Sequence, residues 1–237
     1  MKRQHILFAA LALLALPATA QQMVVPDTIA QRSLACVACH GKEGRATSEG
    51  YFPRIAGKPA GYLYNQLVNF QQGRRQYPLM TYLVDHMSDD YLKEIADYFA
   101  AQHPPYPVSP PSRLPAVAIE RGRALALTGD ASRKIPACAA CHGAALGGVQ
   151  PATPGLLGLP RDYLIAQMGA WKNGSRRAAA PDCMAQVSRQ LSPDDAAAVA
   201  GWLAAQPVPA GMRPAAASAM PIRFPLACGS IPQSHGQ

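Results

Sequence analysis

The sequence predicts an all-α protein made of two similar helical domains, and three observations lead to that prediction. Hydrophobic residues recur at helical spacing in both halves, and no segment shows convincing strand alternation. The segment 103–111 contains five prolines, which remove backbone donors and favour an extended linker between the halves. The second half also repeats the first at an offset of 101: Pro53, Gly57, Pro59, Tyr62, Gln66, Gly73 and Arg75 match Pro154, Gly158, Pro160, Tyr163, Gln167, Gly174 and Arg176.

The N-terminus has the pattern of a secretory signal peptide. Lys2 and Arg3 precede an apolar run over 6–16, and Ala18-Thr19-Ala20 then supplies a cleavage site. The run is shorter than the roughly 20 residues that a membrane span needs. The sequence therefore predicts export to the periplasm, a mature chain that begins near Gln21, and no transmembrane anchor after cleavage.

These patterns divide the chain into five segments. We expect a signal peptide over 1–20, a first domain over 21–103, a Pro-rich linker over 104–115, a second domain over 116–207, and a Pro/Ala-rich tail over 208–237.

Two helices of the first domain can be placed from their ends. Pro59 suits the first position of a helix and Gly73 suits a left-handed cap at its end. A final helix is expected to begin at Ser88, whose hydroxyl can cap it. Between these ends lie apolar residues at helical spacing, namely Leu63, Leu67 and Phe70 in the first helix and Leu92, Ile95, Ala96 and Phe99 in the last.

The second domain repeats the same two helices. Pro160 and Gly174 bound a segment that carries Leu164, Met168 and Trp171, and Ser192 begins the final helix. Acidic residues follow Ser88 and Ser192, and they favour the positive end of a helix dipole.

Each half also contains one Cys-x-x-Cys-His motif, which is the attachment signal of a c-type haem. The motifs run over 36–40 and 138–142. Cysteines three residues apart share one helix face, so both can bond the vinyl groups of one porphyrin. The histidine that follows can then reach iron. The expected residues are Cys36, Cys39 and His40 for the first haem and Cys138, Cys141 and His142 for the second.

The alternatives for these cysteines are a disulfide or half of a zinc site, because paired Cys-x-x-Cys motifs also build zinc ribbons. The separation between the two motifs is much larger than the roughly 15–20 residues of a ribbon, and both are followed by histidine. Composition also favours haem. Only 7% of the residues are aromatic, so two buried porphyrins would supply bulk that the small cores lack.

The sixth iron ligand decides what each haem can do, because a thioether closes the site and raises the potential while an empty position admits small molecules. The first domain offers Met80, His86 and Met87. Met80 lies eight residues before Ser88, and Met184 lies eight residues before Ser192. This matched register favours Met80 and Met184 as ligands. Met87 instead occupies the place of an apolar staple before the helix cap.

Further residues can support the haems. The carbonyls of Pro53 and Pro154 can accept a hydrogen bond from the second ring nitrogen of each ligating histidine, although both prolines are equally compatible with ordinary loops. Arginines after the repeated helix can pair with haem propionates or remain solvated: Arg74, Arg75, Arg176 and Arg177.

The two remaining cysteines, Cys183 and Cys228, are expected to form a disulfide, because an oxidising compartment leaves few exposed thiols free. The alternative is two free thiols. Such a bridge would fold the tail back over the methionine side of the second haem.

These motifs together resemble the dihaem cytochrome c4 family over about residues 30–206. The resemblance rests on both Cys-x-x-Cys-His sites, on residues 52–57 and their counterpart 153–158, on the Tyr-x-x-x-Gln helices and on the late methionines. It implies two class I cytochrome c folds related by a pseudo-twofold axis, and periplasmic carriers that serve terminal oxidases. In the family, a Gln usually follows the Leu-x-Gly segment. In this chain, that position is Lys58 in the first half and Leu159 in the second.

The expected function is therefore single-electron transfer between respiratory donors and a terminal oxidase or reductase, with two covalent haems and no catalytic residue. The alternatives are a cytochrome subunit of a periplasmic dehydrogenase or sulfur-oxidising complex, and a dihaem peroxidase, which the matched methionines disfavour.

The distribution of charge suggests how partners dock. Residues 21–105 hold eight Lys/Arg and eight Asp/Glu, whereas residues 106–237 hold twelve and six. We expect redox proteins, namely a membrane-bound oxidase or dehydrogenase, and not nucleic acid, to dock at the basic second domain.

Overall fold

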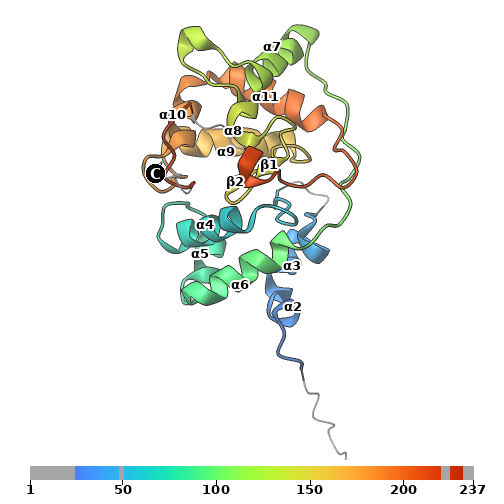
Figure 1. The fold of residues 1–237 in the computed structure, drawn as a ribbon, viewed down its shortest axis with the longest axis vertical. Helices are drawn as coiled ribbons and strands as arrows, with labels where there is room; N and C mark the ends of the chain where they lie inside the picture. The colour runs from blue at the N-terminus through green and yellow to red at the C-terminus, as the bar shows by residue number, and fades with distance from the viewer. Residues whose placement is uncertain (1–24, 48–50, 220–224, 232–237) are drawn as a thin grey trace, which may run out of the picture.

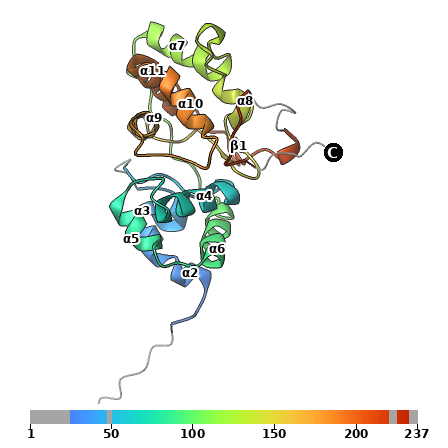
Figure 2. The same cartoon turned by 90° about the vertical axis from the view of Figure 1, so that its left-hand side faces the viewer.

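The computed structural model describes residues 25–47, 51–219 and 225–231 of the 237-residue chain. The expected signal peptide over 1–20 lies outside these described residues. Two helical domains are stacked along the long axis of the molecule, joined by a chain segment that runs up one side (Figures 1 and 2). None of the described helices combines the length and the hydropathy that a membrane crossing requires.

The first domain contains five α-helices and one 3-10 helix among the described residues. In chain order they are α2 (Ile29–Arg32), α3 (Leu34–His40), η1 (Lys42–Gly44), α4 (Ala60–Gln71), α5 (Pro78–Val84) and α6 (Asp89–Ala100).

The second domain adds a small β-ribbon to the same helical plan. Its described elements are α7 (Ala116–Leu127), η2 (Ala131–Arg133), α8 (Cys138–His142), β1 (Gly148–Val149), β2 (Thr153–Pro154), α9 (Arg161–Asn173), α10 (Cys183–Gln190), α11 (Pro193–Ala205) and η3 (Ala217–Ala219).

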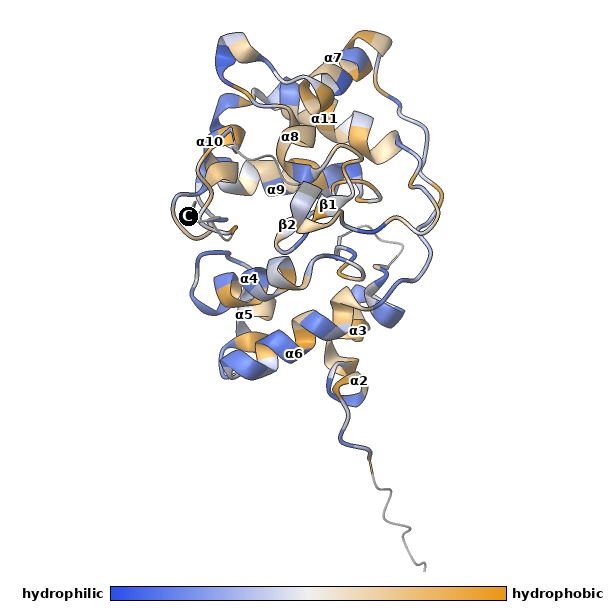
Figure 3. Cartoon of the chain, viewed as in Figure 1, coloured by the Kyte–Doolittle hydropathy of each residue, from blue (hydrophilic) through white to orange (hydrophobic). Residues whose placement is uncertain are grey.

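Helix α6 begins where the sequence predicts. The Ser88 hydroxyl accepts the backbone N–H of Tyr91, and two acidic residues follow in the first turn. The predicted stripe is buried, with exposed fractions of 0–5% for Leu92, Ile95, Ala96 and Phe99. Hydrophilic and hydrophobic residues both occur along α6 (Figure 3), and its apolar side packs near α4.

Helix α11 is the most extensively packed helix of the second domain. Ser192 caps it, and the Asp195 carboxylate accepts a hydrogen bond from the backbone N–H of Ser192, which completes a capping box. The helix crosses α7 at Gly122. A Cβ at Gly122 would lie 2.2 Å from the carbonyl oxygen of Ala198, so this close crossing requires glycine.

The repeated prolines lie one residue earlier than predicted. Pro59 and Pro160 are N-cap residues, not first helical residues, because their ψ angles of 136° and 143° are extended. Gly174 is the left-handed cap of α9, with φ of 82°. Gly73 has φ of 66° and follows the last turn of α4.

The β-ribbon fixes the loop that follows α8. Strands β1 and β2 are antiparallel, and the tail adds to them because Gln150 and Ala215 are joined by a backbone hydrogen bond of 2.8 Å. Two paired residues per strand are too few for any alternating pattern, which is why the sequence did not indicate the ribbon. The predicted all-α class is confirmed, because apart from this ribbon the described elements are helices.

The domains meet through the segments that follow α4 and α9. Arg75 and Arg176, which are repeat equivalents, form an isolated antiparallel bridge. Backbone hydrogen bonds flank it from Gln76 to Ser175 (2.8 Å) and from Arg177 to Arg74 (2.7 Å). Because equivalent segments pair with each other, the contact has pseudo-twofold character.

Candidate haem sites and their shared cavity

Each Cys-x-x-Cys-His motif lies on a short helix, α3 in the first domain and α8 in the second. The cysteines are partly buried, whereas His40 and His142 are buried with 9% and 7% exposed. Gly41 and Gly143 follow the histidines with φ of 73° and 84°, which lets the chain turn sharply out of each helix. The two cysteines and the histidine of each motif therefore lie close together at the end of one short helix.

Both histidines are held by a prolyl carbonyl. The Nδ1 atom of His40 donates to the Pro53 carbonyl oxygen at 2.8 Å, and His142 Nδ1 donates to the Pro154 carbonyl at 2.7 Å. Burial lowers the pKa of both imidazoles, which keeps them neutral, while the carbonyl contacts act in the opposite direction. A neutral ring with Nδ1–H engaged leaves the lone pair of Nε2 for a metal.

The two candidate methionines lie on corresponding short helices. Met80 is the third residue of α5, and Met184 is the second residue of α10, where the Asp182 carboxylate accepts the backbone N–H of Ala185. Both methionines line the same cavity as the histidines. Met87 also lines it, whereas the side chain of His86 is 96% exposed.

That cavity has a volume of about 880 Å³ and is continuous across both domains. Apolar side chains of α4, α6, α9 and α11 contribute to its walls, and all four motif cysteines, both histidines and both candidate methionines border it. A predominantly apolar space bordered by thiols, neutral imidazoles and thioethers fits covalently bound haem. Haem iron held there supplies a reversible ferric–ferrous couple.

Two arginines at the domain boundary strengthen this fit. Arg176 donates to Gln167 (2.7 Å) and to Gln66 of the other domain (2.9 Å), and Arg75 mirrors it by donating to Gln66 (3.1 Å) and Gln167 (2.9 Å). Arg176 is only 4% exposed, yet in the described structure neither guanidinium has a carboxylate within salt-bridge distance. Both border the cavity, where the propionates of bound haems would neutralise them.

The other two predicted arginines have different roles. Arg74 donates to Asn69 at 2.6 Å, and the exposed Arg177 reaches the Gly73 carbonyl at 3.5 Å. Neither borders the cavity. The sequence did not indicate the glutamine and tyrosine partners of Arg75 and Arg176, although their matched repeat positions were a usable signal.

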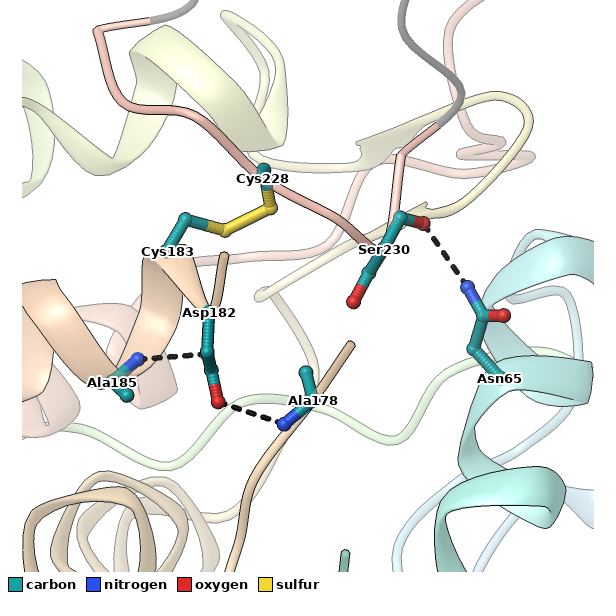
Figure 4. Close-up of a disulfide and its surroundings, with 7 residues drawn as sticks. All are labelled: Asn65, Ala178, Asp182, Cys183, Ala185, Cys228 and Ser230. Atoms are coloured by element: carbon teal, nitrogen blue, oxygen red, sulfur yellow. Dashed lines mark hydrogen bonds between the residues drawn. A yellow bond between two sulfur atoms is a disulfide. The ribbon is translucent and has the colours of Figure 1, made fainter. Parts of the chain in front are cut away.

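Cys183 and Cys228 form a disulfide with a Cα–Cα separation of 4.9 Å. The bridge attaches the tail to Cys183 (Figure 4), which is the first residue of α10 and directly precedes Met184 in the chain. Beyond it, the Ser230 carbonyl accepts a hydrogen bond from Asn65 of α4 at 3.1 Å. The tail therefore contacts both domains beside the cavity.

Comparison with known proteins extends these observations. The cytochrome c family model matches residues 119–206. The thiosulfate dehydrogenase electron acceptor of Thiomonas intermedia is 37% identical over 73% of this chain and 79% of that protein. Cytochrome c4 of Pseudomonas aeruginosa is 30% identical over 73% of this chain and 84% of that protein.

Solved structures give the same picture. Reduced cytochrome c4 from Pseudomonas stutzeri aligns with a TM-score of 0.64 at 26% identity, covering 75% of this chain and 96% of that one. Thiosulfate dehydrogenase from Marichromatium purpuratum aligns with a TM-score of 0.65 at 34% identity over 73% of this chain. This chain spans only 36% of that dehydrogenase.

These relatives establish the cofactor and the role. The chain carries two covalently bound haem c groups, and it is an electron-transfer protein and not an enzyme. The predictions of cofactor, role and family are therefore confirmed. The chain belongs to the dihaem cytochrome c4 family.

Proposed function

We propose that this chain is a periplasmic carrier that accepts single electrons from a thiosulfate-oxidising dehydrogenase and passes them to a respiratory oxidase or reductase. The observation that carries the donor assignment is the 37% identity to two proteins named thiosulfate dehydrogenase electron acceptor. The dehydrogenase of Marichromatium purpuratum, which contains a region similar to this chain, is consistent with it.

We assign the iron ligands of this carrier from the geometry of the two sites. His40 and His142 provide one imidazole each, with Pro53 and Pro154 fixing the ring orientation. Met80 and Met184 would provide the thioethers, because they share one repeat register and line the cavity. Thioethers raise the potential and close the irons to small molecules, which suits a carrier and disfavours a peroxidase.

The carrier works in the periplasm in this proposal. The N-terminal pattern over 1–20 supports export, and an oxidising compartment suits the Cys183–Cys228 disulfide. N-terminal sequencing of protein from the native periplasm should begin at Gln21. A retained residue 1–20 segment, or recovery from the cytoplasm, would contradict this localisation.

The donor is tested by mixing oxidised protein with a thiosulfate dehydrogenase and thiosulfate in a stopped-flow spectrometer. We expect full reduction of both haems, at a rate proportional to the dehydrogenase concentration. Thiosulfate alone is the control, and it should leave the protein oxidised on the same timescale. Reduction no faster than in this control would contradict the assignment of the dehydrogenase as electron donor.

A second candidate is a general respiratory carrier role, which the resemblance to the cytochrome c4 family implies, with another donor. It predicts that the dehydrogenase mixture stays oxidised while oxidase-containing membranes rapidly reoxidise the reduced protein. Copurification of the native protein in a stable stoichiometric complex would instead favour a role as a dehydrogenase subunit.

A further inference from the structure

Lys58 is a buried cation at the boundary between the domains. It precedes α4 in the first domain, and only 5% of the residue is exposed. Its Nζ atom donates a hydrogen bond of 2.9 Å to the Gly155 carbonyl of the second domain. Burial, together with nearby Arg54, lowers the pKa of Lys58 to about 8, so the amine is mostly protonated at pH 7.

The partner of Lys58 belongs to the loop that holds the second histidine. Gly155 directly follows Pro154, whose carbonyl accepts the hydrogen bond from His142 Nδ1. Lys58 and His142 also border the same cavity.

The internal repeat shows that this contact is one-sided. The position equivalent to Lys58 in the second domain is Leu159, which is 9% exposed and packs in the core of that domain. No reciprocal ammonium therefore reaches the His40 loop from position 159. Arg75 and Arg176 are themselves a matched pair and do not distinguish the two sites. The buried Arg54, whose repeat position is Gly155, directly follows Pro53 and lies on the side of the first histidine.

A buried positive charge beside a redox centre stabilises the reduced form, because reduction removes one positive charge from the iron. The Lys58 ammonium lies in a poorly solvated place, and among the described side chains no carboxylate lies within 4 Å of it to cancel its charge. Its effect is thus screened less than that of a surface lysine.

We propose that Lys58 is a positioning residue of the first domain that raises the reduction potential of the haem held in the second domain relative to that of the first. Through Gly155 it also fixes the loop whose Pro154 carbonyl orients His142. The electron of a half-reduced molecule is thereby biased toward the second domain. This proposal is independent of the identity of the donor.

The test compares Lys58→Gln, Lys58→Met and Lys58→Arg in the full-length dihaem protein. Two potentials are measured by optical redox titration, and paramagnetic NMR of the axial methionine signals assigns each potential to a domain. We expect both neutral variants to lower the second potential while the first stays constant. The fraction of half-reduced molecules with the electron in the second domain should fall several-fold.

Two comparisons separate the charge from a structural role. Lys58→Arg keeps the charge and should retain most of the wild-type difference between the potentials. Lys42→Met removes an exposed lysine of the same domain and should change neither potential measurably. The proposal is overturned if the neutral variants leave the second potential unchanged, if both potentials move equally, or if Lys58→Arg behaves like Lys58→Gln.

Discussion

At the scale of single residues, the histidines are the most fully constrained groups of the two sites. Each imidazole is buried, and each is tied through Nδ1 to a prolyl carbonyl 12 or 13 residues further along the chain. The ring plane is therefore set before iron is bound.

The methionine assignment gives the first prediction. Met80→Ala should remove half of the thioether-to-iron charge-transfer band of the ferric protein, because one of two sixth ligands is lost. Met87→Ala is the matched control, since Met87 borders the same cavity from the segment between α5 and α6. It should leave the band intact. The reverse pattern would show that the repeat register misidentifies the ligand.

Met80→Ala should also open one iron to exogenous ligands. Ferrous protein is expected to bind one carbon monoxide per molecule, and the affected potential should fall. Wild-type protein should bind none under the same conditions, and binding by the wild type would contradict closure by two methionines.

At the scale of elements, a cluster of ion pairs stabilises the N-terminus of α11. Asp195 accepts from Arg121 (3.0 Å) and Arg133 (2.7 Å), and Asp130 accepts from the same two guanidiniums. Together they join η2, α7 and the start of α11. The Asp195 side chain is only 7% exposed, so this cluster is less screened than the surface ion pairs.

This cluster predicts a specific pH dependence. For Asp195, burial alone would raise the pKa, but the hydrogen bonds from Arg133, Ser192 and Arg121 outweigh it and hold the pKa well below its usual range. Because the folded pKa lies below the unfolded value of 3.8, the stabilisation is complete above that value and is lost as pH falls below it. Thermal unfolding followed from pH 5 to pH 2 should show a steep loss.

The variant Asp195→Asn should be less stable at pH 6 and should lose less stability over that acid range. Asp90→Asn, at an almost fully exposed carboxylate, is the control and should behave like the wild type. Equal acid sensitivity of Asp195→Asn and wild type would contradict a role for the cluster.

The tail and α10 give a prediction about the disulfide. The double variant Cys183→Ser/Cys228→Ser should lower the free energy of unfolding by about 2–4 kcal/mol, because the bridge closes a long loop. It should also lower the potential of the second haem, since the bridge adjoins Met184. Denaturant titration and redox titration measure the two effects.

Asn65→Ala is the comparison, because it removes only the hydrogen bond to Ser230 and should cost about 1 kcal/mol. Thiol titration of denatured, unreduced protein provides the decisive check. Two reactive thiols per molecule would refute the bridge, and none would support it.

Elements with a repeat counterpart were the ones that the sequence could locate. The helices after Pro59 and Ser88 could be placed because their caps and apolar stripes recur one domain later. Helix α7, whose close crossing depends on Gly122, and the tail against β1 depend on contacts between distant segments, which no local pattern encodes. Likewise, Lys58 was visible only as a departure, because its partner lies in the other domain.

At the scale of the whole molecule, symmetry and asymmetry have different consequences. Arg75 donates to Tyr163 and Gln167 of the second domain, and its counterpart Arg176 donates to Tyr62 and Gln66 of the first, which fixes how the domains are stacked. Charge does not follow this symmetry. Residues 21–105 balance eight basic against eight acidic side chains, whereas residues 106–237 carry twelve basic and six acidic ones. Haem propionates subtract from both domains alike, so the molecule is electrostatically polar.

This polarity predicts that an acidic donor docks at the second domain. Because Arg176 is buried, steering must depend on exposed residues such as Arg177 and Arg189, of which Arg189 lies on α10. Reversing both to Glu should slow association with the dehydrogenase by roughly 10-fold at low ionic strength. The matched control, Lys42→Glu/Arg45→Glu, makes the same charge change at exposed sites of the first domain and should slow association much less.

The association rates of the wild type and both variants, measured by stopped flow against salt concentration, should converge as screening shortens the Debye length to about 8 Å. Equal slowing by both pairs would mean that net charge alone, without orientation, governs the encounter.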